Sequence, residues 1–402
     1  MNYSLKRFLT IAYTVFFKAH TTTARITPKR IAILVAVFAI YISVELVTWT
    51  CFLLDEIFFP GFRRQQVRQP VFIVGNPRSG TTFLHRLMAA DEQTFRSIAL
   101  WEILFAPSVT QRKIVWAIVA IDRRLGGALR RAVMWFDHRF VRASNVMHRM
   151  SLLAPEEDEY FLIHQGATII AGLFFGLPEA SLPFVYFDAR LSRREKRKVM
   201  RFYRHCLRRH LHAHGGGLHI LSKNPYFTPK IDALYQFFPD AKIIYLARNP
   251  LSVVPSYASL SAHWWRMLGE PEKRYPHTDF IIAATQHWYR DPVARLDRVP
   301  ETSRVFVDFH ELIADPERVV TGIYKQFGFA ISDDFAHILK QAKEVSGRHE
   351  SAHTYSLEDI GMTRAQILSD YQDVFARWEF DPELGASNQA SATEQSPSPD
   401  RL

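Results

Sequence analysis

PVFIVGNPRSGTT, at residues 70 to 82, is an apolar run that ends in a short polar loop. The four consecutive apolar residues Val71 to Val74 predict a strand that is buried on both faces of a parallel sheet. Residues 83 to 88 carry apolar side chains at helical spacing, so a helix is expected to open directly after the loop. A strand, a polar loop and a helix N-terminus in this order are typical of a phosphate-binding loop.

The residue types of the loop suit an anionic ligand. Gly75 and Gly80 allow the backbone to turn tightly, and Arg78 brings a planar guanidinium with several donors. The loop residues that we expect to bind the ligand are Asn76, Pro77, Arg78, Ser79, Gly80, Thr81 and Thr82. The Gly-Lys-Ser/Thr ending of nucleoside triphosphatase loops is absent, which disfavours an ATPase.

Two further motifs follow apolar runs later in the chain. Arg248 stands at the end of the run 241 to 247, and Ser256 follows it eight residues on, so both side chains can bind one phosphate. Lys223-Asn-Pro follows the short strand expected at 218 to 222, and another strand is expected at 304 to 309. Strands that alternate with helices predict an α/β fold of three layers around a central parallel sheet, of the P-loop type.

Together the three motifs resemble those of the sulfotransferases that use 3′-phosphoadenosine 5′-phosphosulfate (PAPS) as donor. PRSGTT resembles their 5′-phosphosulfate loop, and Arg248 with Ser256 resembles their 3′-phosphate motif, although Asn249 replaces the usual Asp. Lys223-Asn-Pro is similar to the Lys-Asp-Pro element of the branch that includes tyrosylprotein and many bacterial sulfotransferases. The resemblance covers about residues 70 to 380 and extends to segments at 304–316 and 355–361.

The resemblance implies transfer of a sulfuryl group from PAPS to a hydroxyl or amine, with no metal required. Arg78 and Lys223 would neutralise charge on the leaving phosphate, and a carboxylate or histidine must remove the acceptor proton. Glu102, in Leu-Trp-Glu, is the expected base, although it lies three residues further along than in the tyrosylprotein branch. The alternatives for this role are Glu156, Glu157 and His148.

The acceptor stays open between a small molecule, a carbohydrate and a lipid. The residues considered for its pocket are Trp101, Trp264, Trp265 and Arg266, although aromatic residues are more often part of a core. Two alternatives compete with the enzyme: a non-catalytic, membrane-tethered nucleotide-binding protein, and a phosphotransferase. The basic stretch 192 to 214 is interpreted as a solvated helix face, and its histidines as surface residues.

Residues 31 to 54 predict a membrane helix, because about 20 apolar residues cross the hydrocarbon core of a bilayer. Glu45 interrupts this run, and a buried helix of the soluble core is the alternative. The expected organisation is a basic segment at 1–30, the membrane helix at 31–54, a sulfotransferase domain at 65–383 and a disordered tail at 384–402. Deleting residues 1 to 60 is then expected to release the protein from membranes and to leave donor binding intact.

A formal net charge of +10 over 402 residues favours anionic ligands or an anionic membrane surface. No nucleic-acid-binding motif occurs, so nucleic acid is not an expected partner, and nothing indicates the oligomeric state. The chain has two cysteines, and the catalytic part has no N-glycosylation sequon. We therefore expect no disulfide and a catalytic domain that faces the cytosol on a single N-terminal anchor, the alternative being a type II protein of the Golgi lumen.

Overall fold

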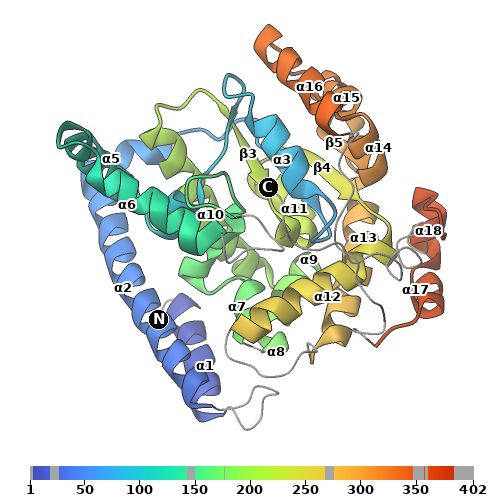
Figure 1. Cartoon of the computed structure of the whole chain (residues 1–402), viewed down its shortest axis with the longest axis horizontal. Coiled ribbons are helices and arrows are strands. Elements are labelled where there is room, and N and C mark those ends of the chain that lie inside the picture. The colour runs from blue at the N-terminus through green and yellow to red at the C-terminus, as the bar shows by residue number, and fades with distance from the viewer. Residues whose placement is uncertain are drawn as a thin grey trace, which may run out of the picture.

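The structure, a computed structural model, describes residues 3–18, 27–142, 150–175, 177–267, 276–346, 357 and 361–383. Its centre is a five-stranded sheet in the order β2-β3-β1-β4-β5 (Figure 1). All neighbouring strands run parallel, as the sequence predicted. The strands are β1 (Val71–Gly75), β2 (Phe95–Arg96), β3 (His219–Lys223), β4 (Lys242–Ala247) and β5 (Arg304–Asp308). Strand β2 was not predicted from the sequence.

Helices precede, connect and follow the strands. Those up to β3 are α1 (Tyr3–Phe17), α2 (Pro28–Phe58), α3 (Thr81–Ala89), α4 (Leu100–Leu104), α5 (Val109–Arg124), α6 (Ala128–Phe136), the 3₁₀ helix η4 (Asp158–Gln165), α7 (Ile170–Phe175), α8 (Pro178–Val185), α9 (Phe187–Arg190) and α10 (Arg193–Ala213). Those after β3 are α11 (Ile231–Phe237), α12 (Pro250–Met267), α13 (Thr278–Leu296), α14 (Phe309–Ala314), α15 (Pro316–Phe327), α16 (Asp333–Ser346), α17 (Arg364–Asp370) and α18 (Gln372–Trp378).

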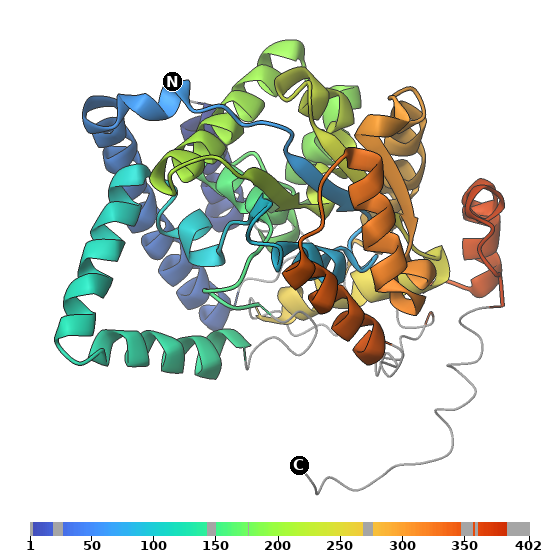
Figure 2. The same ribbon diagram turned by 90° about the horizontal axis from the view of Figure 1, so that it is seen from above.

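The sheet separates two hydrophobic cores, so the protein has three layers (Figure 2). Side chains of a strand point alternately to its two faces. In β1, Phe72 and Val74 enter the larger core, which includes residues of α10 to α13. Val71 and Ile73 enter the smaller core, with residues of α3, α15 and α16. Burial on both faces is the reason that β1 is a continuous apolar run.

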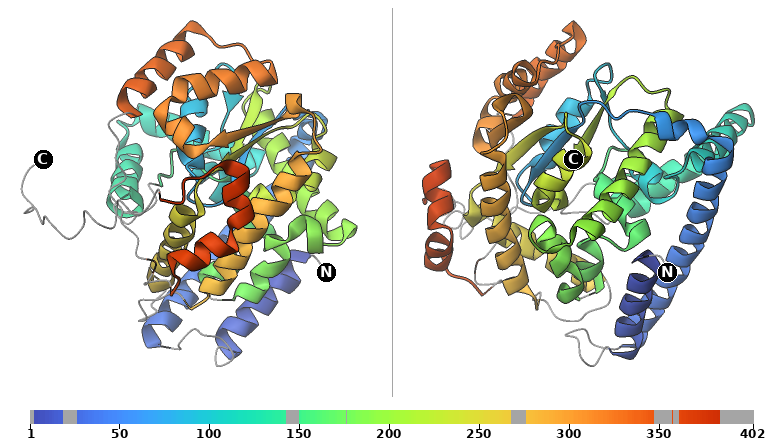
Figure 3. Two further views of the ribbon diagram at one scale, coloured as in Figure 1. Left: turned by 90° about the vertical axis from the view of Figure 1, so that its right-hand side faces the viewer. Right: turned by 180° about the vertical axis from the view of Figure 1, so that it is seen from behind.

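Helix α2 lies along one flank of the molecule beside α1 (Figure 3). One face of it is exposed and apolar, and the opposite face is bonded to the catalytic part of the chain. Tyr41 donates its hydroxyl to the carbonyl of Ile163 at 3.0 Å, and Glu45 lies 2.6 Å from Nδ1 of His164. The carboxylate that interrupts the apolar run therefore points into the protein, where it has a partner.

The C-terminal end of α2 is also bonded to the catalytic part of the chain. Asp55 is fully buried, and its carboxylate accepts hydrogen bonds from the backbone N–H groups of Val109 and Thr110 at the start of α5. The same carboxylate pairs with Arg209 of α10 at 2.9 Å. An acidic group at a helix N-terminus satisfies free N–H groups and the helix dipole. Helix α2 is therefore both long and apolar enough to cross a membrane and a packed part of this fold.

Helix α10 corrects the interpretation of the basic stretch. Ser192 and Glu195 form a capping box at its start, and the glycine run from Gly215 follows its end, as expected. Its charges are not all solvated, however, because Arg209 and His210 are buried. The two cysteines are unpaired and buried. The segment 355–361, apart from residues 357 and 361, and the tail 384–402 lie outside the described residues.

Candidate active site

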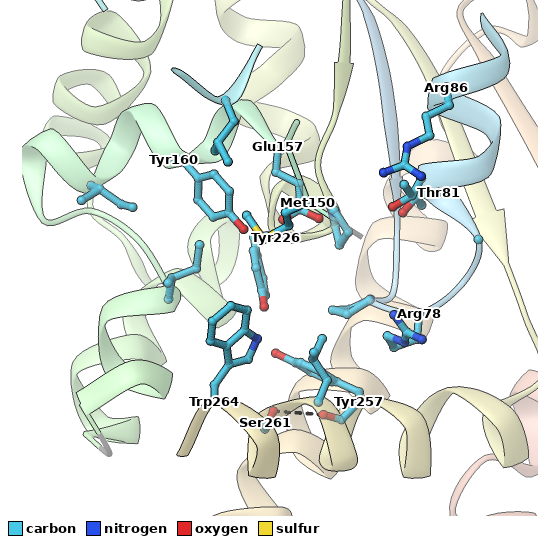
Figure 4. A pocket seen from close by; sticks show the side chains of 18 of the residues that line it. Arg78, Thr81, Arg86, Met150, Glu157, Tyr160, Tyr226, Tyr257, Ser261 and Trp264 are labelled. Carbon is cyan, nitrogen blue, oxygen red and sulfur yellow. Dashed lines mark hydrogen bonds between the residues drawn. The ribbon is translucent and has the colours of Figure 1, made fainter. Parts of the chain in front are cut away.

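The carboxyl ends of β1, β3 and β4 border one cavity of about 450 Å³. β1 leads into the loop 76–80, β3 ends at Lys223 and β4 leads into Arg248. Parallel sheets place ligands at this edge, where the strand order reverses. Figure 4 shows Arg78 and Arg86 on one side of the cavity and Tyr160 and Trp264 on the other. The cavity thus has a cationic side and an aromatic side.

Steric constraints fix the backbone of the loop after β1. Gly75 has φ 145° and Gly80 has φ 89°, values that favour glycine. A Cβ atom at Gly75 would lie 2.3 Å from the carbonyl oxygen of Leu246, and one at Gly80 would lie 2.5 Å from the ring of Phe309. Arg78 is not a glycine yet has φ 73°, a strained conformation that is typical of ligand-binding loops. Helix α3 starts at Thr81, so its first free N–H groups border the loop.

Two polar side chains of the loop are buried without a protein partner. Both polar atoms of the Asn76 amide and the hydroxyl of Ser79 lack hydrogen bonds to the described residues, and both residues are fully buried. A buried polar group without a partner is costly, so these atoms are candidates to bind a ligand at the loop, although neither residue lines the cavity in this structure. With the cation of Arg78 and the N-terminus of α3 beside them, they fit a phosphate or phosphosulfate group.

The structure joins the two phosphate motifs directly. Nε of Arg78 donates to the hydroxyl of Ser256 at 2.9 Å, and Nη1 of Arg248 donates to the carbonyl of Arg78 at 2.9 Å. The guanidinium of Arg248 lies over the ring of Phe309, 4.2 Å from its centre. Tyr289 donates its hydroxyl to the carbonyl of Arg248 at 2.5 Å. These contacts place two arginines and a serine from distant parts of the sequence at the same end of the cavity.

Lys223 does not line the cavity itself but contacts two acidic residues. Its ammonium is 2.9 Å from Oε1 of Glu157 and 3.6 Å from Oε2 of Glu156, and all three residues are buried. Burial lowers the pKa of Lys223, but the carboxylates of Glu157 and Glu156 outweigh this effect and raise it, so the lysine stays charged. Of these three residues, Glu157 lines the cavity.

Asp158 holds the Glu157 segment against the end of β3. Its carboxylate accepts hydrogen bonds from Ser222 at 2.7 Å, from Asn224 at 3.1 Å and from the hydroxyl of Tyr203. Burial raises the pKa of Asp158 to about 6 against the opposing effect of these hydrogen bonds. Asp158 is therefore a positioning residue that orients Glu157 and Lys223 toward each other.

Glu102 is not among the residues that line this cavity. Its Oε1 lies 2.8 Å from Nε2 of His214 and 3.2 Å from Nε of Arg112, and the residue is buried. Burial raises the pKa of Glu102, but the hydrogen bond from His214 and the charge of Arg112 outweigh this effect and hold the pKa well below its usual range. A carboxylate occupied in this way is a poor proton acceptor, so the geometry does not support the expectation that Glu102 is the base.

Glu102, His210 and His214 bring one ligand atom each to within 4.8 Å of one another, an arrangement that a metal ion could use. Burial lowers the pKa of His210 well below its usual value, so this imidazole is neutral. Arg112 is fully buried and already supplies a positive charge to the same carboxylate oxygen. A cation beside this guanidinium would be repelled, so we interpret the group as a structural ion pair between α4, α5 and α10.

The cavity contains residues that sequence reasoning did not select. Arg86 lies one helical turn after Thr82 on α3, and its side chain lies beside Thr81 at the cavity (Figure 4). Helical spacing from the loop was the signal that could have identified it. Of the residues considered for the acceptor pocket, Trp264 lines the cavity, whereas Trp101, Trp265 and Arg266 do not. The other aromatic lining residues are Tyr160, Tyr226 and Tyr257. His148 lies outside the described residues.

Comparison with known proteins identifies the family of this chain. A model of the sulfotransferase family matches residues 70–333, which include the loop after β1, Lys223 and Arg248. The chain belongs to the sulfotransferase family. Among curated relatives, this sulfotransferase is 24% identical over 331 residues to an omega-hydroxy-beta-dihydromenaquinone-9 sulfotransferase, Stf3, of Mycobacterium bovis, with the same identity to Stf3 of Mycobacterium tuberculosis. The alignment covers 78% of this chain and 75% of the relative.

Two solved structures share the fold of this sulfotransferase. Sulfotransferase STF9 from Mycobacterium avium superposes with a TM-score of 0.73 at 16% identity, covering 95% of this chain and 92% of that one. Sulfotransferase STF1 from Mycobacterium tuberculosis superposes with a TM-score of 0.66 at 20% identity, covering 91% and 92%. Both matches include more of the chain than the family model does, so the likeness in fold extends beyond residues 70–333. The chain is an enzyme that transfers a sulfuryl group.

Proposed function

We propose that this sulfotransferase moves a sulfuryl group from PAPS to a hydroxyl group, on a membrane surface, with Glu157 as the general base. One observation carries the proposal: Arg78, Arg248 and Glu157 border the same cavity although they follow β1, follow β4 and precede η4, respectively. The arginines, with Asn76 and Ser79, would hold the two phosphate groups of the donor. The aromatic side of the cavity would hold the acceptor.

The reaction needs little more than these groups. An acceptor oxygen forms a bond to sulfur while the bond between sulfur and the 5′-phosphate oxygen breaks, leaving a sulfate ester and 3′-phosphoadenosine 5′-phosphate (PAP). Glu157 takes the acceptor proton, and Lys223, 2.9 Å from Glu157, stabilises the negative charge that develops nearby. Arg78 and Arg86 stabilise the leaving phosphate.

The pair of Glu157 and Lys223 suits both the removal of the acceptor proton and the departure of the phosphate. While the pair is intact, the ammonium holds the carboxylate of Glu157 at the cavity, where it can accept a proton. Once Glu157 is protonated, its hold on Lys223 weakens, and the ammonium can interact with the departing phosphate oxygen. Glu156, 3.6 Å away, keeps the buried lysine paired throughout.

Membrane association follows from the apolar faces of the N-terminal half. Helix α2 has a long apolar stretch, and only 17% of it is buried. Helices α5 and α6 add exposed apolar side chains, among them Ile118, Trp135 and Phe136. Because α2 is bonded to the catalytic part near its start through Arg30, in its middle through Tyr41 and near its end through Asp55, we propose that it lies on one leaflet and does not cross the bilayer. The proposed side is the cytosolic leaflet, because PAPS is made in the cytosol.

Calorimetry with PAP and AMP tests the donor. We expect PAP to bind 10-fold to more than 100-fold more tightly than AMP, because each charged hydrogen bond to the extra phosphate contributes about 1.5 to 3 kcal/mol. Equal affinities would contradict the assignment of Arg248 and Ser256 to a 3′-phosphate. Transfer of labelled phosphate from ATP, in place of sulfate from PAPS, would favour the phosphotransferase, and tight PAP binding without any transfer would favour the non-catalytic protein.

The relative's printed name supports a lipid-soluble acceptor. That protein acts on an omega-hydroxylated menaquinone derivative, which carries its hydroxyl on an isoprenoid chain. A hydroxyl on an apolar molecule suits a cavity whose acceptor side is lined by Leu100, Leu104 and Trp264. Incubation of the full-length protein with labelled PAPS and a lipid extract, followed by mass spectrometry of sulfated products, would identify the acceptor.

A further inference from the structure

A second cavity, of about 240 Å³, lies beneath α1 and α2. It shares two wall residues with the catalytic cavity, Ile163 and Ile170. The remaining wall comes mainly from apolar residues of α1, α2 and α7, including Ile11, Val37 and Phe175. The two cavities are therefore neighbours, divided by two aliphatic side chains.

The lining of the second cavity offers few polar partners to water. Its polar side chains, Tyr41 and Thr168, both donate hydrogen bonds to protein: Tyr41 to the carbonyl of Ile163 at 3.0 Å and Thr168 to Glu159 at 2.8 Å. A water molecule in a cavity needs two to four polar partners, and apolar cavities of this size stay dry and bind apolar molecules. The chemistry of the lining selects a hydrocarbon chain.

We propose that the apolar chain of the acceptor occupies this second cavity while its hydroxyl lies at Glu157. The proposal rests on the proposed function and narrows its acceptor to a molecule with a hydroxyl at the end of an aliphatic or isoprenoid chain. The apolar chain of the acceptor passes between Ile163 and Ile170 and reaches the contact between α1 and α2, whose outer faces are apolar. A lipid can then enter from the leaflet on which α2 lies, without its chain crossing water.

Chain length is the first test. We expect kcat/KM for primary n-alkanols from butanol to dodecanol, with full-length protein and labelled PAPS, to rise about fourfold for each methylene that becomes buried, and then to level off. Val37→Trp, which fills the second cavity, should flatten this rise and leave PAP affinity and transfer to butanol unchanged. Val35→Trp is the matched control, because Val35 lies on the same helix with 54% of its surface exposed. It should behave like the wild type.

A crosslinking probe gives a second readout that does not depend on turnover. A 16-carbon primary alcohol with a diazirine near its tail end, added with PAP, should label α1 and α2 at residues of the second cavity, and Val37→Trp should abolish this labelling. Two labelling results would overturn the proposal. One is labelling confined to the outer face of α2, and the other is labelling of a lipid that remains bound to the protein when the alcohol is added. So would a chain-length profile that Val37→Trp leaves unchanged. Failure of the proposed function itself would look different: no sulfated alcohol of any length, or no preference for PAP over AMP.

Discussion

At the scale of single residues, two buried glutamates have opposite environments. Glu157 borders the catalytic cavity with Lys223 as partner, whereas Glu102 is enclosed by Arg112 and two histidines. Glu157→Gln should lower the rate constant for transfer about 10²- to 10⁴-fold, as expected on loss of a general base, and should leave PAP affinity within a few-fold. Single-turnover kinetics with labelled PAPS and a lipid acceptor measures this rate.

Glu102→Gln is the matched control for that experiment. Because the amide cannot neutralise the buried Arg112, we expect a loss of about 1 to 3 kcal/mol in the free energy of unfolding. Transfer per folded molecule should stay within a few-fold of the wild type. A folded Glu102→Gln variant that has lost transfer, beside a Glu157→Gln variant that keeps it, would return the role of base to Glu102.

Arg248 should determine selectivity for the donor. Arg248→Met removes the cation proposed to hold the 3′-phosphate, so PAP affinity should fall about 10- to 100-fold, the equivalent of one charged hydrogen bond. Affinity for AMP, which lacks this phosphate, should change little. Calorimetry of both nucleotides measures the ratio, and a parallel loss for PAP and AMP would show that Arg248 acts only by holding the loop through its bond to Arg78.

Among the secondary-structure elements, the loop between β1 and α3 depends most on its backbone conformation. Gly80→Ala should abolish or strongly weaken PAP binding, because the added methyl group meets Phe309 and because φ is positive at this position. Gly322→Ala is the control: it lies inside α15 with no atom within 4 Å of the added Cβ, so it should keep PAP affinity and gain about 0.5 to 1 kcal/mol of stability. Calorimetry and thermal denaturation distinguish the two results.

The packing of α10 against α4 and α5 should make stability depend on pH. Burial keeps the folded-state pKa of His210 well below the unfolded value of about 6.5, so below this pH only the unfolded chain takes up the proton. Stability due to His210 is therefore full above about pH 6.5 and is lost as the pH falls, by about 1 kcal/mol at pH 5.5. The groups that face His210 are Glu102, Arg112, His214 and Arg96.

Thermal denaturation at pH 7.5 and 5.5 tests this linkage. The drop in melting temperature from pH 7.5 to pH 5.5 should be smaller for His210→Gln than for the wild type, because the variant has no titratable group at this position. Glu102, whose folded-state pKa is also depressed, adds a further loss only below about pH 4.5. An equal drop in both proteins would mean that His210 does not contribute to the acid sensitivity.

The strands that carry the site could be predicted because they are buried on both faces and are therefore uniformly apolar. The two-residue strand β2 has no such pattern, and its pairing with β3 depends on tertiary contacts alone. The phosphate loop and Arg248 were predictable because each directly follows a strand. Glu157 could not be selected over Glu102 in this way, since it starts a 3₁₀ helix without periodicity and reaches the cavity through bonds that Asp158 makes to residues more than 60 positions away.

At the scale of the whole molecule, the N-terminal helices are part of the catalytic fold. Deleting residues 1 to 60, which the sequence suggested as a way to release a soluble domain, would remove Asp55 from the start of α5 and from Arg209. It would also remove Phe52 from the main core. We now expect this deletion to unfold the protein, because it leaves a buried arginine and helix N–H groups without partners.

Point substitutions on the outer face of α2 test membrane binding without this damage. Leu46→Glu and Leu53→Glu together should release the protein from vesicles, because both side chains are more than 60% exposed and their charges would enter the apolar region of the leaflet. Co-sedimentation with vesicles of phosphatidylcholine and phosphatidylglycerol measures this release. Thr321→Glu, an exposed position on α15, is the control and should remain bound. If the variant with both substitutions sediments like the wild type, α2 is not the contact surface.

The packing of α2 along the catalytic part has a kinetic consequence. An enzyme on a flexible tether could sample acceptors in solution, but here the helix is bonded to α5 and α10, so the cavity keeps one height above the leaflet. The enzyme would then meet its acceptor in two dimensions, by lateral diffusion. Its rate should follow the mole fraction of acceptor in the membrane, so that adding inert phospholipid at constant acceptor concentration slows the reaction by surface dilution.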